Sequence, residues 1–205
     1  MALYRERVLP HVINTVMDTA TTRAIRARVC AGLSGEVLEI GFGTGHNLPY
    51  VPADVTLLHA VEPSAVSARL ARDRIAAAPF PVEVVGLDGQ RLPLEDDSVD
   101  HVLCTWSLCT IPDGVAAVRE MRRVLRPGGE LRFVEHGVAP DAGVARWQRR
   151  LTPVQRRLGG GCHLDRDISG ILAAGGMRVR DLERYYADKE PRPFGAMYEG
   201  VAVAA

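Results

Sequence analysis

The spacing of apolar positions changes along the chain. Within residues 4–32 apolar side chains recur three or four positions apart, which predicts one or two helices leading into the domain. Short continuous apolar runs bounded by Gly, Pro and polar residues follow, and these predict buried strands. The N-terminal helical pattern consists of Leu9, Val12, Ile13 and Val16, followed by Ile25, Val29 and Leu33.

Strand and helix patterns alternate through most of the remaining chain. Strands are expected at residues 37–40, 56–61, 82–85, 99–105, 130–135, 177–185 and 196–203. Helices are expected at residues 64–78, with Ser64 as N-cap, and at 113–125, 141–158 and 165–174. This order predicts an α/β fold, a mostly parallel sheet with helices on both faces. We expect one domain over residues 1–205, with a helical cap over 1–33 and a lid-like insertion over 137–164.

A glycine-rich turn, Gly41–Gly45, directly follows the first strand of the expected sheet. Ligands of such sheets bind beyond the carboxyl ends of the strands. Glycines allow positive φ angles and a close approach of a ligand to the backbone. A helix beginning near His46 and Asn47 would add free N–H groups. The turn therefore predicts a nucleotide-like ligand.

Glu39, His46 and the glycine spacing distinguish between cofactors. A dinucleotide fingerprint needs a glycine at the position of His46. Glu39, just before the turn, would repel a pyrophosphate and attract an ammonium group. S-adenosylmethionine carries an ammonium group and no phosphate, so it fits better than NAD. The residues expected to contact it here are Glu39, Gly41, Phe42, Gly43, Gly45 and Asn47.

Two further acidic residues end the second and third strands. Glu62, followed by Pro63, stands 21 residues after Gly41, and its two oxygens can accept hydrogen bonds from both ribose hydroxyls. Asp88, with Gly89 and Gln90 beside it, can accept a bond from the adenine amine. A single acidic residue at a strand end is usually only solvated. Three in chain order match the three polar parts of one ligand.

Composition narrows the class of protein. The 205 residues are 47% hydrophobic and 24% charged, which is typical of a soluble globular domain. With 25 basic and 25 acidic residues the chain lacks the basic surface of a nucleic-acid-binding protein. No apolar run reaches a membrane-spanning length and the N-terminus has no signal-peptide core, so a cytoplasmic protein is expected. The four cysteines match no zinc-ligand spacing, so we expect reduced thiols and no metal.

Four segments together resemble the class I methyltransferases, particularly the ubiquinone/menaquinone-type family. They are VLEIGFGTG (37–45), VEPS (61–64), GLDGQRLPLEDDSVD (86–100) and RRVLRPGGELRFVEH (122–136). The resemblance implies S-adenosylmethionine as cofactor, with S-adenosylhomocysteine as product. It implies a Rossmann-like three-layer sandwich, with a seven-stranded sheet and an antiparallel last strand. It also places Thr105 and Trp106 beside the sulfonium and the substrate entrance.

The C-terminal third is similar to the thiol methyltransferases of the methyltransferase-like 7 type. The similar features are Glu135-His136, the insertion around Trp147, Gly161-Cys162-His163-Leu164, and Pro191 to Gly195. This implies a small, fairly apolar acceptor; a sulfur, oxygen, nitrogen or carbon atom remains open, and a thiol is favoured. Those relatives carry a hydrophobic N-terminal anchor, a pattern that the N-terminal residues here do not show, so stable membrane insertion is not expected.

Methyl transfer is an in-line displacement that requires alignment, exclusion of water and removal of any acceptor proton. His136, at the end of the fifth strand, and His163, after a glycine triplet, are the candidate bases. Each can equally be a structural hydrogen-bonding histidine, and a thiolate acceptor needs no base. Cys109, which with Cys104 flanks Trp106, lines the substrate pocket or packs as a small apolar residue.

The insertion over residues 141–158 allows three interpretations. It contains Trp147 and five arginines, and as a helix it carries an apolar stripe. The first interpretation is a lid that closes over the substrate, with Trp147 in contact with the substrate. The second is a surface helix with a solvated basic face. The third is a helix docked on an acidic membrane. For the whole chain, two alternatives to a methyltransferase stay open: an NAD-dependent oxidoreductase, and a non-catalytic S-adenosylmethionine-binding sensor.

Overall fold

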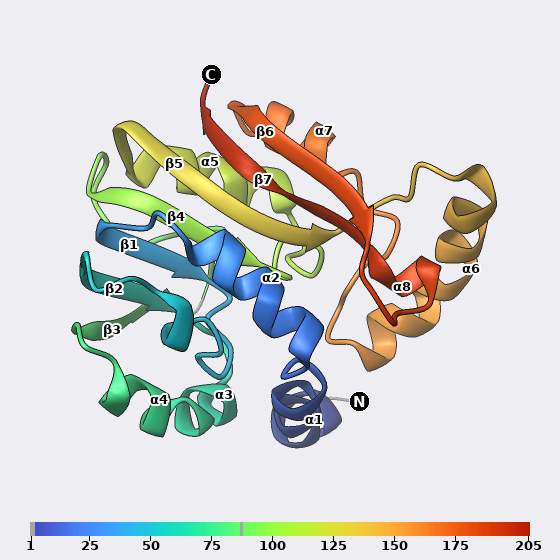
Figure 1. The fold of residues 1–205 in the computed structure, drawn as a ribbon, viewed down its shortest axis with the longest axis horizontal. Helices are drawn as coiled ribbons and strands as arrows, with labels where there is room; N and C mark the ends of the chain where they lie inside the picture. The colour runs from blue at the N-terminus through green and yellow to red at the C-terminus, as the bar shows by residue number, and fades with distance from the viewer. Residues whose placement is uncertain (1–2, 87) are drawn as a thin grey trace.

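The computed structural model describes residues 3–86 and 88–205, and it is built on a seven-stranded sheet (Figure 1). The strand order is β3-β2-β1-β4-β5-β7-β6, and only β7 runs against its neighbours. The expected α/β class, with its mostly parallel sheet and reversed last strand, is confirmed. The strands are β1 (Gly35–Ile40), β2 (Val55–Val61), β3 (Val82–Gly86), β4 (Val99–Thr105), β5 (Leu125–His136), β6 (Met177–Tyr186) and β7 (Ala196–Ala204).

Helices cover both faces of the sheet, as the alternating pattern predicts. They are η1 (Tyr4–Val8), α1 (Leu9–Val16), α2 (Ala20–Cys30), η2 (Leu48–Tyr50), α3 (Ala65–Leu70), α4 (Arg72–Ala77), α5 (Gly114–Val124), α6 (Ala142–Leu158), α7 (Ile168–Ala174) and α8 (Arg192–Gly195). The expected helix over 64–78 is divided at Ala71 into α3 and α4. Ser64 is its N-cap, accepting a bond from the Ser67 amide.

Side chains of each central strand alternate between two hydrophobic cores. Leu38 of β1 and Val102 of β4 pack in the core that contains α5 and α7. Val37 and Leu103 pack in the core that contains α2. Because the side-chain period of a strand is two, Glu39 shares the α2 side with Val37. The strand pattern therefore decides which helix lies over the first acidic residue.

The segment after the glycine turn differs from expectation. An α-helix was expected to begin near His46 and Asn47, but the structure has only one turn of 3-10 helix, η2. Pro49 lies within this turn and Pro52 follows it, and neither provides the backbone N–H that a longer helix needs. Asn47 therefore acts through the hydrogen bonds of its side chain, and no α-helix begins at this position.

The helix α6 confirms the helical pattern at 141–158 but packs through a different face. Its buried residues are Ala145, Gln148 and Thr152, while Trp147 and Val154 are 56% and 53% exposed. Gln148 accepts a bond from the Ala139 amide and donates to two backbone carbonyls. Gln148 therefore anchors this helix, together with Leu151 of the apolar stripe, which packs against the cluster of Cys109, Cys162 and Leu164.

The carboxyl ends of β1, β4 and β5 point to one side of the molecule, with α1 and α6 flanking that side (Figure 1). Across the described ranges, no helix combines the length and the apolar character needed to cross a membrane. Because β1, β2 and β4 run parallel, their carboxyl ends, and with them the predicted residues Glu39, Glu62 and Thr105, lie at one edge of the sheet.

Candidate functional site

At the end of β1, Glu39 is a buried carboxylate with one oxygen that accepts no hydrogen bond from the described residues. It is 1% exposed, and its Oε1 accepts a hydrogen bond of 2.8 Å from Asn47 Nδ2. Its Oε2 is buried and has no hydrogen-bond partner among the described residues. Burial raises the pKa of Glu39 to about 7, although the Asn47 bond acts in the opposite direction. The carboxylate lacks a donor at one oxygen.

Asn47 joins the glycine turn to two other parts of the chain. Its Nδ2 also donates to Thr105 Oγ1, at 3.0 Å, at the end of β4. Its Oδ1 accepts a 2.6 Å bond from Arg26 of α2. The structure therefore brings together three predicted residues, Glu39, Asn47 and Thr105, and adds Arg26, which the sequence analysis did not assign to the site.

Glu62, at the end of β2, holds the glycine turn in shape. Its Oε2 accepts a 2.7 Å bond from the Gly43 amide, and its Oε1 accepts one of 2.7 Å from the Ser64 amide. Burial raises the pKa of Glu62, and these two bonds act against that shift. Each oxygen keeps one further lone pair. Glu62 therefore has a structural role within the chain and capacity for an additional donor.

The turn leaves a face of its backbone open. Gly41, Gly43 and Gly45 have φ angles of +70°, +59° and +76°. A Cβ at Gly43 would meet only the Gly41 carbonyl oxygen, at 3.8 Å, whereas one at Gly41 would collide with Ser107. Phe42, inside the turn, is buried in the α2 core. The backbone at Gly43 can therefore be approached by another molecule.

Asp88 and its neighbours lie more peripherally, after β3. The Asp88 side chain is exposed, and its Oδ1 accepts bonds from the side chain and the amide of Gln90, which lower its pKa. A Cβ at Gly89 would approach Ile40 to 3.1 Å, so Gly89 keeps this loop close to the end of β1. Pro63 is exposed beside Glu62. Asp88 makes no described contact with Glu39 or Glu62.

The loop after β4 is fixed by Glu135 of β5. This carboxylate is fully buried and accepts bonds of 2.8, 2.9 and 3.0 Å from the amides of Ser107, Leu108 and Cys109. Burial raises its pKa, and the three amides act in the opposite direction. Glu135 is not among the site residues predicted from the sequence; its signal there is a carboxylate near the end of the strand pattern Leu131 to His136. Glu135 positions the loop that carries Trp106 and Cys109.

Trp106 is held in an unusual backbone conformation at the start of that loop. Its φ is +50°, a region that costs a non-glycine residue about 1–2 kcal/mol. Its indole Nε1 is buried without a partner among the described residues, and the Arg26 guanidinium lies 4.7 Å from the ring centroid. Such strain clusters at functional sites. The predicted substrate residue Trp106 thus lies beside the group around Glu39.

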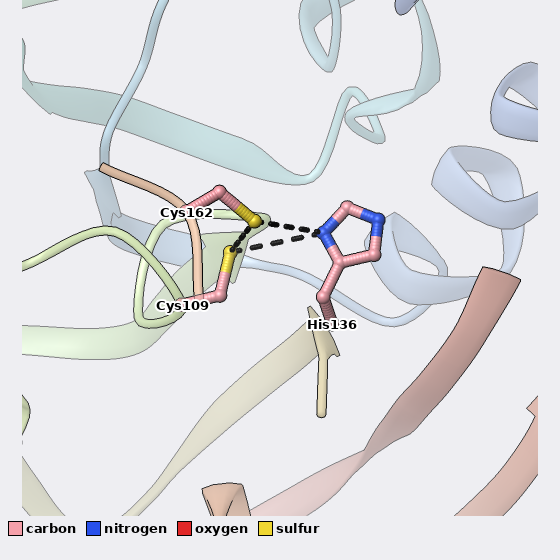
Figure 2. Close-up of side chains that lie close together, drawn as sticks. All are labelled: Cys109, His136 and Cys162. Carbon is pink, nitrogen blue, oxygen red and sulfur yellow. Dashed lines mark hydrogen bonds between the residues drawn. The ribbon is translucent and has the colours of Figure 1, made fainter. Parts of the chain in front are cut away.

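Cys109, His136 and Cys162 converge from three segments (Figure 2). The two sulfur atoms are 3.7 Å apart, and His136 Nδ1 lies 3.8 Å from Cys109 Sγ and 3.7 Å from Cys162 Sγ. Hydrogen bonding to Cys109 lowers the pKa of Cys162 to about 5. Burial lowers the pKa of His136, but the contact with Cys162 more than compensates, so the net shift is upward. The cysteine spacing alone gave no sign of this group.

His163 lies next to this group, and Trp147 does not. The His163 amide donates to the Cys109 carbonyl at 2.8 Å, and its Nδ1 lies 3.1 Å from Arg166 Nη2. Burial and the positive charge of Arg166 lower the pKa of His163. Trp147 is exposed on α6, where Arg150 lies over its ring at 5.5 Å. The structure therefore does not bring Trp147 together with the other predicted residues.

The sequence and the fold of this chain are similar to those of known methyltransferases. A family model described as "Methyltransferase domain" matches residues 38–133. Among solved structures, a SAM-dependent methyltransferase from Aquifex aeolicus superposes with a TM-score of 0.67, at 17% identity, over 96% of this chain and 98% of that one. At that identity the likeness supports the fold alone.

Two relatives are more similar in sequence. The human thiol S-methyltransferase TMT1B is 34% identical over 185 residues, which are 84% of this chain and 72% of that protein. The TMT1B of Rattus norvegicus is 34% identical over 142 residues, 66% of this chain and 58% of the relative. The chain therefore spans between about three fifths and three quarters of the length of these two relatives.

Proposed function

The chain belongs to the class I S-adenosylmethionine-dependent methyltransferases, and from this premise we propose that it methylates a small, fairly apolar molecule, with a thiol as the favoured acceptor. The observation that carries the cofactor part of the proposal is the unpartnered Glu39 Oε2, buried beside a glycine turn whose backbone is open at Gly43. The names of the relatives, thiol S-methyltransferases, support the acceptor class.

The residues at this edge fit S-adenosylmethionine better than a dinucleotide. The raised pKa of Glu39, about 7, shows that its buried carboxylate lacks a nearby positive charge and a hydrogen-bond donor strong enough to offset burial. An ammonium group would supply both. A pyrophosphate would add negative charge at the same place. The raised pKa of Glu62, a second buried carboxylate, makes a phosphate still less favourable.

We assign the cofactor contacts by position. Glu39, Asn47 and the turn would hold the methionine part, and the spare lone pairs of Glu62, with Pro63 beside it, would accept from the ribose. Asp88 and Gly89 would lie against adenine. When bound, S-adenosylmethionine supplies a methyl group on a sulfonium centre. Thr105 and Trp106 would lie closest to that centre, where the Trp106 ring excludes water.

The acceptor side is assigned to the loop that Glu135 fixes and to the segments next to it. Cys109 would line this side. His163 is the proposed base for an acceptor that arrives protonated, because its lowered pKa keeps the ring neutral near pH 7. His136 directs Nδ1 at two sulfur atoms, which leaves Nε2 for such a role. A thiolate acceptor would need neither histidine.

The flanking segments are proposed to enclose the site. His46 Nε2 lies 3.1 Å from the Asn14 carbonyl oxygen, so the helical cap is attached to the glycine turn. At the other side the lid-like insertion is anchored through Gln148 to the loop after β5. Each flanking segment is thus tied to a loop at the edge of the sheet where the proposed site lies.

Calorimetric titration with S-adenosylmethionine and with NAD tests the proposal. We expect S-adenosylmethionine to bind and NAD not to bind; the reverse result would establish the oxidoreductase alternative. Release of S-adenosylhomocysteine is then measured with thiols, phenols and amines, and thiols should give the fastest release. Normal cofactor binding without release for any acceptor would favour the sensor.

Glu62→Ala tests the cofactor assignment. Removing the carboxylate should weaken S-adenosylmethionine binding at least tenfold, or about 1.5 kcal/mol for hydrogen bonds to a charged group. Glu183→Ala, at an exposed position of β6, is the matched control and should bind normally. Equal affinity of the two variants would show that Glu62 does not contact the cofactor.

A further inference from the structure

We propose that Cys109, His136 and Cys162 form a binding site for one zinc ion. The three donor atoms lie within 4.8 Å of one another, and all come from different segments: the loop after β4, the end of β5, and the loop after α6. Both cysteines are buried, and the histidine is partly buried. The site is separate from Glu39 and Glu62, so it stands independently of the cofactor assignment. A His136 that binds zinc through Nδ1 carries its proton on Nε2, so in the zinc-bound protein the base role falls to His163.

The distances between the donor atoms match the edges of a zinc tetrahedron. With Zn–S of about 2.3 Å and Zn–N of about 2.0–2.1 Å, tetrahedral angles place two sulfur ligands about 3.8 Å apart and a sulfur and a nitrogen about 3.6 Å apart. The structure has 3.7 Å between the sulfur atoms, and 3.7 and 3.8 Å from them to His136 Nδ1. All three edges therefore have the right length without movement of the backbone.

A disulfide does not explain the cluster equally well. A disulfide bond is about 2.05 Å long, so the two sulfur atoms would have to move closer by more than one and a half ångströms. The third group is also unexplained by a disulfide, because His136 Nδ1 points at both sulfur atoms (Figure 2). Two thiolates and an imidazole are the donor set that zinc prefers.

Hydrogen bonds outside the cluster hold its members in place. The Cys109 amide donates to Glu135, and the Cys109 carbonyl accepts from the amide of His163, next to Cys162. The Cys162 amide donates to the Gly159 carbonyl at 3.2 Å. Such outer contacts orient metal ligands and are a regular feature of metal sites. The two cysteine-bearing loops are thus fixed relative to each other before any ion binds.

The site supplies three ligands and leaves one position open. Among the described residues, no further histidine, cysteine, aspartate or glutamate joins the three in this cluster. Zinc sites with three protein ligands take water or another exogenous ligand in the fourth position. The proposed site is therefore of the open type.

The test is a metal titration of the 205-residue chain, kept reduced and freed of metal with a chelator. Cobalt(II) is added first, because thiolate ligands give a charge-transfer absorption in the near ultraviolet, and zinc(II) is then used to displace it. We expect one equivalent of each metal to bind, with a spectrum characteristic of two thiolates in a tetrahedral site.

Variants assign the ligands. Cys162→Ser and His136→Asn should each raise the dissociation constant for zinc on the order of 100-fold or more, beyond the effect of losing an outer-shell partner. Cys30→Ser is the matched control, since Cys30 is a buried cysteine of the α2 core, and it should bind zinc as the unchanged protein does. The cobalt spectrum of the unchanged protein decides the question even if a variant folds poorly. Absence of the charge-transfer band there, or zinc binding that survives Cys162→Ser, would overturn the proposal.

Discussion

Glu39 at the end of β1 and Glu135 at the end of β5 are both buried carboxylates, but they accept different numbers of hydrogen bonds. Both are almost fully buried, and burial raises the pKa of both. Glu135 receives three backbone amides, whereas Glu39 receives one side-chain amide and has an oxygen without a described partner. Burial alone does not separate a structural acid from a ligand-binding acid; the number of donors does.

Glu135→Gln should have the largest effect on stability. The glutamine places an N–H donor against a backbone donor and removes a charge-assisted bond, so the free energy of unfolding should fall by about 3–4 kcal/mol. Urea unfolding measures it. Glu183→Gln, at an exposed position, should change stability by less than about 0.5 kcal/mol. Equal values for the two variants would remove the distinction between Glu135 and an ordinary acid.

Glu39→Gln should change stability in the opposite direction. A folded-state pKa of about 7, above the ordinary 4.5, means that ionisation at pH 8 disfavours the fold. Neutral glutamine removes this cost, so the free energy of unfolding of the ligand-free protein at pH 8 should rise by up to about 3 kcal/mol. S-adenosylmethionine should bind at least tenfold more weakly.

Denaturant unfolding and calorimetry of Glu39→Gln together decide between two roles. Destabilisation similar to that of Glu135→Gln, with unchanged cofactor affinity, would make Glu39 a second structural acid. Higher stability combined with lost affinity would sharpen the contrast between the two carboxylates.

The pH dependence should separate folding from binding. Because the pKa of Glu39 is raised in the folded state, its contribution to stability is lost as pH rises from about 4.5 to about 7 and is constant above. Affinity for S-adenosylmethionine should rise over the same interval, by about tenfold or more, as the carboxylate becomes charged. Calorimetry at several pH values measures the affinity. In Glu39→Gln this dependence should be absent, and its persistence would assign it to another group.

Gly43→Ala should have the smallest effect on stability. The φ of +59° costs alanine about 1 kcal/mol, and the added Cβ meets only one carbonyl oxygen, at 3.8 Å. The methyl group would, however, occupy the open face of the turn, so cofactor affinity should fall more than tenfold. Gly128→Ala is the matched control, with φ +85° and open space around its Cβ. The same affinity in both variants would mean that the ligand does not approach Gly43.

Much of the fold, and the positions of Glu39 and Glu62 at strand ends, could be predicted, because their signals are local in the chain. A buried strand running into glycines, with a carboxylate before the turn, is a continuous pattern, and Glu39 and Glu62 lie at strand ends as predicted. The strand period of two and the alternation of elements also placed the helices on both faces. The prediction of a helix beginning near Asn47 is wrong, because Pro49 and Pro52 lack the backbone N–H groups that a continuing α-helix needs.

The cluster of Cys109, His136 and Cys162 and the packing of α6 could not be predicted in the same way, because their contacts join distant segments. His136 lies 27 residues after Cys109 and 26 before Cys162, so no spacing motif connects them. Helical periodicity shows which residues share a face of α6, but not that Gln148 would face the protein while Trp147 faces outward. Which face of a surface helix is covered depends on its partners, and those are known only once the chain is folded.

The position of Arg26 over Trp106 has a consequence for recombination between relatives. The family match, residues 38–133, contains Trp106, but the two side chains that hold its surroundings, Arg26 and Glu135, lie outside it on opposite flanks. A chimera that exchanges only one flank would combine Arg26 from one relative with the segment around Glu135 from another. In such a chimera we expect the conformation of Trp106, and with it the proposed acceptor side, to depend on both flanks jointly.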